Sequence, residues 1–147
     1  MDEDAFRDTY HRVNATRCVF EKALNSRQCR CHLARHFILA GRDGFGCRAS
    51  AHQARCREFL DTLRQRARFA LGVTRADQPL PHAREIRVQN GGLRGLAALL
   101  GEAAEPPDIA TTIDHALARY GSVESVPYGE LVKSILRYEA RPRRRRR

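Results

Sequence analysis

Apolar residues recur every three or four positions through the first half of the chain, a spacing that predicts amphipathic helices. A first helix is expected over residues 4–26, a short second one over 33–40, and a third over 50–71. Ser50 lies three residues before Gln53, which is the spacing of a capping box at a helix start. The residues on the apolar face of the first helix are Phe6, Tyr10, Val13, Phe20 and Leu24. Residues 1–71 are therefore predicted to form a three-helix unit.

The second half carries weaker periodicity, interrupted by prolines. Residues 72–85 are predicted to be a linker, because Pro79 and Pro81 disfavour helix there. Residues 86–140 are expected to form a smaller helical module, and residues 141–147 a disordered Arg-rich tail. The predicted fold class is all-α, with an N-terminal three-helix unit, a smaller helical module and a basic C-terminal tail.

Charge and hydropathy narrow the class of protein. The net charge is +10, and all but two of the 27 basic residues are arginines, the exceptions being Lys22 and Lys133. No apolar run is long enough to cross a bilayer, and the acidic N-terminus lacks the basic start of a secretory signal. We therefore expect a cytoplasmic protein without a membrane anchor.

Five cysteines lie in the first 56 residues and none follows them. They are Cys18, Cys29, Cys31, Cys47 and Cys56. In a reducing cytosol, clustered cysteines are more often metal ligands or redox groups than disulfides, and an odd count agrees with that interpretation. The cysteine spacing is the strongest indication of chemistry in the chain.

The predicted helices suggest which thiols converge. Cys29 and Cys31 fall in a turn, and Cys47 lies just before the third helix, so all three have backbone that can bring them to one centre. Cys18 lies off the apolar face of its helix, so packing does not explain it. Cys56 lies within the apolar face of the third helix, where a buried cysteine is an ordinary core residue. The predicted metal ligands are therefore Cys18, Cys29, Cys31 and Cys47. Cys56 is expected either to replace one of them or to lie next to the bound cofactor.

The ligand set suits either an iron-sulfur cluster, such as [4Fe–4S], or a tetrahedral zinc ion. Zinc sites usually contain pairs of cysteines two to four residues apart, and these irregular spacings favour the cluster. Histidines leave a mixed zinc site open, since His32 and His36, like His52 and Cys56, are four residues apart. One such mixed set is Cys29, His32, Cys47 and Cys56. Taken singly, each histidine is more often a polar surface residue or a helix cap than a ligand.

Other functions have weaker support in the sequence. The stretch Val88–Gly95 resembles a strand, a glycine turn and a helix start that could cradle phosphate, but close helix packing explains its glycines better. A possible helix-turn-helix over residues 109–136 lacks a basic reading face. No catalytic group accompanies the thiols, so we expect a protein that is not an enzyme.

The leading hypothesis is an iron-sulfur protein that acts as a redox, electron-transfer or cluster-carrying accessory to a larger protein partner. The alternative is a basic module that binds nucleic acid or an acidic protein and whose cysteines are structural. Its electrostatic contacts would come from the tail. The tail arginines are Arg143, Arg144, Arg145, Arg146 and Arg147.

Overall fold

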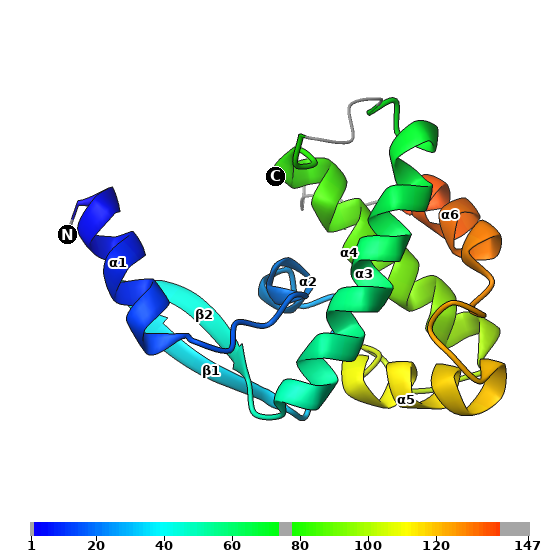
Figure 1. Cartoon of the computed structure of the whole chain (residues 1–147), viewed down its shortest axis with the longest axis horizontal. Helices are drawn as coiled ribbons and strands as arrows, with labels where there is room; N and C mark the ends of the chain where they lie inside the picture. Colours follow the sequence, from blue (N-terminus) through cyan, green and yellow to red (C-terminus); the bar gives the residue numbers. More distant parts are fainter. Residues whose placement is uncertain (1, 74–77, 139–147) are drawn as a thin grey trace, which may run out of the picture.

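The computed structural model describes residues 2–73 and 78–138, and this part of the chain folds into six helices and one two-stranded antiparallel sheet (Figure 1). In chain order the elements are α1 (Glu3–Val13), α2 (Glu21–Asn25), β1 (Ala34–Leu39), β2 (Arg42–Cys47), α3 (Ser50–Ala70), α4 (His82–Leu99), α5 (Ile109–Tyr120) and α6 (Tyr128–Arg137). The fold is mixed α and β. The all-α prediction is wrong, and the N-terminal three-helix unit is replaced by a helix, a short helix, a hairpin and a helix.

The predicted second helix is the first strand of a hairpin. Strands β1 and β2 pair in antiparallel register, with Ala34 opposite Cys47 and Leu39 opposite Arg42. The two residues between them, Ala40 and Gly41, both have positive φ (51° and 75°), as a tight hairpin turn with right-handed strand twist requires. Gly41 therefore closes a hairpin and does not end a helix.

The predicted first helix is also divided. Helix α1 ends where the Asn14 backbone N–H bonds to the Tyr10 carbonyl, and α2 begins only at Glu21. The segment between them runs beside β2, because Cys18 N–H donates to the Phe45 carbonyl at 3.0 Å. The apolar residues that seemed to share one helical face therefore belong to two helices with different neighbours.

Helix α1 covers the hairpin, and together they project from the helical part of the molecule (Figure 1). The Arg42 guanidinium lies 4.3 Å from the Phe6 ring centroid and is paired with Glu3 at 2.6 Å. The Tyr10 and Phe37 rings stand 5.7 Å apart between α1 and β1. The projecting unit is joined to the helices at the inner end of the hairpin and through Glu21 of α2, which accepts hydrogen bonds from the Tyr10 hydroxyl and from Phe45 N–H.

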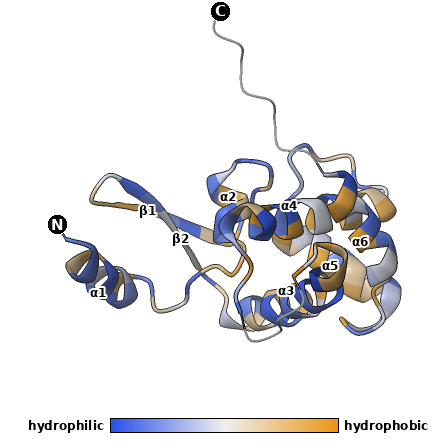
Figure 2. Ribbon diagram, turned by 90° about the horizontal axis from the view of Figure 1, so that it is seen from above, coloured by the Kyte–Doolittle hydropathy of each residue, from blue (hydrophilic) through white to orange (hydrophobic). Residues whose placement is uncertain are grey.

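The hydrophobic core lies among α3, α4, α5 and α6, where apolar residues of these helices face one another (Figure 2). Phe59 of α3 is central to it, since its ring lies 6.3 Å from Phe20 and 5.9 Å from Tyr128. Both Phe20, just before α2, and Tyr128, at the start of α6, are buried. Residues from both sides of the predicted linker therefore share one core.

Helix α4 replaces the predicted extended piece and glycine turn. It begins at His82, within the predicted linker, and continues through the glycines without a break. A Cβ at Gly91 would stand 2.8 Å from the Ile135 Cα, and a Cβ at Gly95 2.5 Å from the Ser134 Oγ. These glycines allow α6 to lie directly against α4, so they serve helix packing and form no phosphate-binding turn.

Two further predictions concern the remaining parts of the chain. The long third helix is confirmed as α3, although its N-cap is Ala49 and no side chain caps it, so the capping box is absent. The arginine tail lies outside the described residues. None of the helices in the described ranges is long and apolar enough to cross a membrane.

Candidate functional site

Four of the five cysteines line one small cavity between the hairpin, α3 and the start of α5. Its volume is about 20 Å³, and Cys18, Cys31, Cys47 and Cys56 contribute to its wall together with His52. We call it the thiol cavity. The four thiols come from four separate segments of the chain, so tertiary folding alone brings them together.

Backbone hydrogen bonds between the segment after α1 and strand β2 fix two of these cysteines. Cys18 N–H donates to the Phe45 carbonyl at 3.0 Å, and Cys47 N–H donates to the Thr16 carbonyl at 2.7 Å. The Cys18 sulfur also receives a backbone N–H from Phe20. The Cys47 thiol donates to the Ala49 carbonyl at 3.2 Å. This short stretch of sheet-like pairing therefore holds Cys18 and Cys47 on adjacent backbone.

Cys31 is held by the loop that joins α2 to β1. Its neighbour Arg30 exchanges backbone hydrogen bonds with the start of α5, donating to the Pro107 carbonyl at 3.0 Å and accepting from Ile109 N–H at 2.7 Å. Asp108 caps α5 and accepts a hydrogen bond from His32 N–H at 2.8 Å. The loop is thus fastened to α5, and the Cys31 sulfur accepts backbone N–H groups.

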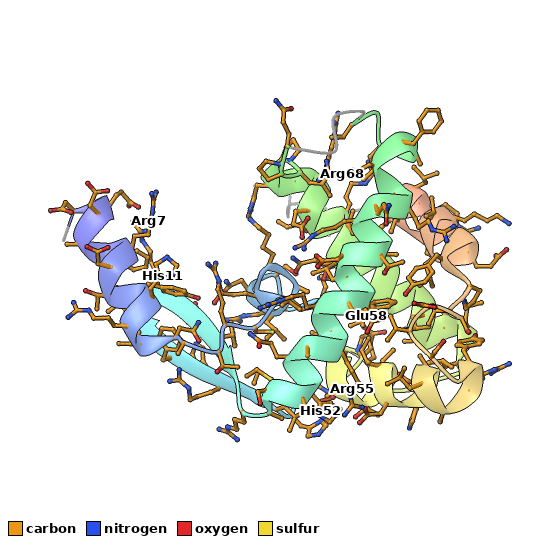
Figure 3. The ribbon with its side chains drawn as sticks, viewed as in Figure 1. Arg7, His11, His52, Arg55, Glu58 and Arg68 are labelled. Carbon is orange, nitrogen blue, oxygen red and sulfur yellow. The ribbon has the colours of Figure 1, made fainter. Side chains whose placement is uncertain are left out.

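Cys56 approaches from α3, one helical turn after His52. It is nearly buried, and both side chains face the thiol cavity because residues four apart share a helical face. The His52 Nε2 lies 3.1 Å from both carboxylate oxygens of Asp114 on α5, and Arg55 pairs with the same carboxylate at 3.2 Å. Figure 3 shows His52 and Arg55 together at the end of α3 nearest α5. The carboxylate fixes the imidazole beside the thiols.

Cys29 lies elsewhere. Its buried thiol donates to the Asn90 Oδ1 of α4 at 3.6 Å, and it lines a separate cavity of about 340 Å³ that also reaches Arg27 and His36. It does not line the thiol cavity. The structure therefore brings together three of the four predicted ligands, Cys18, Cys31 and Cys47. The fourth cysteine of the cavity is Cys56 and not Cys29.

Of the two predicted histidine pairs, His52 with Cys56 lies at the thiol cavity and His32 with His36 does not. His32 and His36 do not share a helical face, since His36 belongs to β1 and His32 precedes it. His32 is paired with Asp108 at 2.9 Å and His36 with Asp43 at 2.7 Å, both at the surface. Only His52 lines the thiol cavity, so a four-residue spacing on a confirmed helix, His52 to Cys56, was the useful signal.

Burial governs the electrostatics of the cavity. It raises the pKa of Cys18 and of Cys56 to about 12, and it also raises the pKa of Cys31. For Cys56, burial is the largest cause of the raised pKa, and like-charge repulsion from Cys18, Cys31 and Cys47 contributes to it. Without a counter-charge the raised pKa values keep the thiols of Cys18, Cys31 and Cys56 protonated at neutral pH. A divalent cation between them would reverse this balance, because it favours the thiolate form.

The four sulfurs of the thiol cavity are not arranged as a metal coordination shell. Within residues 2–73 and 78–138, no three His, Cys, Asp or Glu side chains are arranged so as to hold a metal ion as they are. Metal binding at the thiol cavity therefore requires deprotonation and a local inward movement of the sulfurs.

Comparison of the chain with protein-family models, with curated proteins and with solved structures finds no match. The site is interpreted from its own geometry.

Proposed function

We propose that this chain is a metal-binding protein that holds a single zinc ion between Cys18, Cys31, Cys47 and Cys56. The observation that supports this most is the convergence of four thiols, from four segments, on one small cavity. Four-cysteine sets are typical of structural zinc sites, which are tetrahedral and closed. A set of four unrelated core cysteines has no reason to share one cavity.

The size of the cavity favours one ion over a cluster. A volume of about 20 Å³ exceeds only slightly the 10–15 Å³ or so that one water-sized guest needs. A zinc ion with four Zn–S bonds of about 2.3 Å would draw the sulfurs inward. The iron-sulfur cluster favoured by the sequence contains several iron and sulfide atoms, and it would require the cavity walls to move apart.

Two features of the surroundings suit thiolate ligands. Backbone N–H groups of Phe20 and Leu33, each two residues beyond a cysteine, donate to the sulfurs of Cys18 and Cys31 and favour their charged form. Apart from His52 and Gln53, the remaining wall is apolar, with Ile109 and Val19 among its residues. Four cysteine ligands would fill the tetrahedral shell of a zinc ion and leave no position open for a substrate, so the proposed role is structural.

The ion would fasten the projecting unit to the helices. Cys18 and Cys47 belong to the hairpin side, Cys31 to the loop tied to α5, and Cys56 to α3. In Figure 1 this junction is where the hairpin meets the lower end of α3, next to α5. Because binding energy for such an ion appears as folding energy, removal of the metal should loosen the whole N-terminal third of the protein.

The test is the metal content of the purified protein and of two matched variants. Cys31→Ser removes a thiol of the cavity, whereas Cys29→Ser removes a buried thiol two residues away that does not line it. We expect one zinc per chain in the wild type and in Cys29→Ser, and zinc loss in Cys31→Ser. If protein purified without oxygen contains iron and sulfide, the proposal of a zinc ion is wrong and the site holds an iron-sulfur cluster. Metal-free wild-type protein with five titratable thiols would refute metal binding altogether.

A further inference from the structure

An open cleft of about 670 Å³ lies on the other side of Cys18 from the thiol cavity. Its walls are the start of α2, one face of α3, and the segment from Pro79 to Gln89. This volume lies within the range typical of small-molecule sites, about 300–1,000 Å³. Cys18 and Val19 line both this cleft and the thiol cavity, and no other proposed zinc ligand lines the cleft.

Basic side chains dominate the cleft, which we call the basic cleft. Arg57, Arg64 and Arg68 line it from α3, at spacings of seven and four residues that place them on one helical face. Figure 3 shows Arg68 towards the opposite end of α3 from His52. Arg17, in the segment before α2, and Lys22, in the first turn of α2, line the cleft as well. Cations therefore converge from two sides of the cleft.

Acidic groups do not cancel this charge. Among the described residues that line the cleft, three are acidic, Glu21, Asp61 and Glu85, against five basic ones. Glu21 is paired with Arg17 at 2.7 Å. Arg64 is paired with the other two acids, Glu85 at 2.5 Å and Asp61 at 2.9 Å.

Lys22 and Arg57 carry the unbalanced charge. Lys22 donates to the His82 Nδ1 at 2.5 Å, and neither Lys22 nor Arg57 forms an ion pair with an acidic residue of the described chain. Arg57 is exposed on α3. Their N–H groups are therefore available to an anion from solvent.

The floor of the cleft is rigid and the rim is partly apolar. Gln89 is buried beneath it and bonds to three groups: Ala23 N–H, the Val19 carbonyl and Glu85. Leu80 and Pro79 form the apolar part of the rim. A ligand with anionic groups at one end and an organic part at the other matches this arrangement.

We propose that the basic cleft binds a small phosphorylated molecule of the size of a nucleoside diphosphate, with its phosphates held by Arg57 and Lys22. Guanidinium groups bind phosphate oxygens in bidentate fashion, and the mixed walls suit the remainder of such a molecule. Arg57 and Lys22 are not ligands of the proposed zinc ion, so failure of the zinc proposal would leave this one unaffected.

The experiment is calorimetric titration of the full chain with pyrophosphate and with ADP, at low and at physiological salt. We expect saturable binding of one ligand per chain, tighter for ADP because of the organic part. Arg57→Gln and Lys22→Gln should each weaken it about tenfold, as loss of one charge-assisted hydrogen bond predicts. Both residues are outside the core, and far-UV circular dichroism checks that the variants fold.

Arg66→Gln is the matched control, because it removes the same charge from the same helix. Residue 66 is nine positions from Arg57, which places it on the opposite side of α3, where its guanidinium lies 6.0 Å from the Tyr128 ring. Unchanged affinity in Arg66→Gln supports the cleft. Equal weakening by Arg57→Gln and Arg66→Gln would show attraction by net charge alone and overturn the proposal, as would absence of saturable binding. Binding of single-stranded RNA with equal losses in both variants would overturn it in favour of a diffuse nucleic-acid surface.

Discussion

Substitution of Gly91 by alanine should destabilise the protein, although alanine is the better helix former. The new Cβ would stand 2.8 Å from the Ile135 Cα and 3.3 Å from the Ile135 N. Carbon atoms prefer about 3.5–4.0 Å, so α6 would have to retreat from α4 by roughly 0.7 Å. The obstacle is backbone, which cannot rotate away as a side chain can.

The magnitude follows from two opposing effects. Overpacking costs about 1–3 kcal/mol, and a backbone clash belongs at the upper end. Helix propensity returns about 1 kcal/mol on replacing glycine with alanine. The expected net loss in the free energy of unfolding is about 2 kcal/mol, which corresponds to a fall in Tm of about 4–8 °C for a chain of this length.

Gly129→Ala on α6 supplies the control. A Cβ there meets nothing within 4 Å, so the same substitution should stabilise the protein by about 0.4–1 kcal/mol. Urea unfolding of wild type and both variants measures the two effects. If Gly91→Ala proves neutral or stabilising like Gly129→Ala, then the close approach of α4 and α6 is not what requires glycine at position 91.

Two further predictions concern buried polar pairs. Burial, together with the hydrogen bond to Glu21, raises the pKa of Tyr10 to about 12. The protonated phenol is favoured in the folded state, so its contribution to stability is complete below about pH 10 and is lost as the pH rises through about 12. Absorbance titration should show a late tyrosine that is missing in Tyr10→Phe, and an unchanged curve would rule this out. Arg64→Met should lower the free energy of unfolding by about 3 kcal/mol, because it leaves the buried Glu85 carboxylate without its charged partner. Arg66→Met should lower it by under about 1 kcal/mol. Similar losses in the two variants on thermal unfolding would contradict the role of the Arg64–Glu85 pair.

The sequence predicted the long third helix well but not the hairpin before it. Helix α3 carries an uninterrupted apolar face, including Phe59 and Leu63, and this pattern survives in the structure. The hairpin depends instead on two consecutive residues with positive φ, Ala40 and Gly41. A single glycine after an apolar run is equally common at helix ends, so the turn could not be distinguished locally.

The division between α1 and α2 was hidden for a different reason. Phe20 and Leu24 keep the helical spacing set by Phe6 and Tyr10, yet the segment between the helices is held by hydrogen bonds to β2. Those bonds join residues about 30 positions apart in sequence, such as Cys47 N–H and the Thr16 carbonyl. Local periodicity carries no information about them.

The thiol cavity was predictable in part. Cys18, Cys31 and Cys47 were placed together because their expected backbone was irregular, or because packing did not explain them. The exchange of Cys29 for Cys56 was not predictable, since it depends on which side of the loop faces α4 and on which side of α3 faces α5. The structure also shows that a cysteine on an apolar helical face can line a polar site at the edge of the core.

X-ray absorption spectroscopy at the zinc edge tests the central claim most directly. Our account predicts one zinc per chain with four sulfur ligands at about 2.3 Å and no nitrogen or oxygen ligand. The spectrum should remain the same in Cys29→Ser and lose its four-sulfur shell in Cys56→Ser. A wild-type spectrum with nitrogen or oxygen ligands, a four-sulfur shell that persists in Cys56→Ser, or a protein that contains no zinc would contradict it.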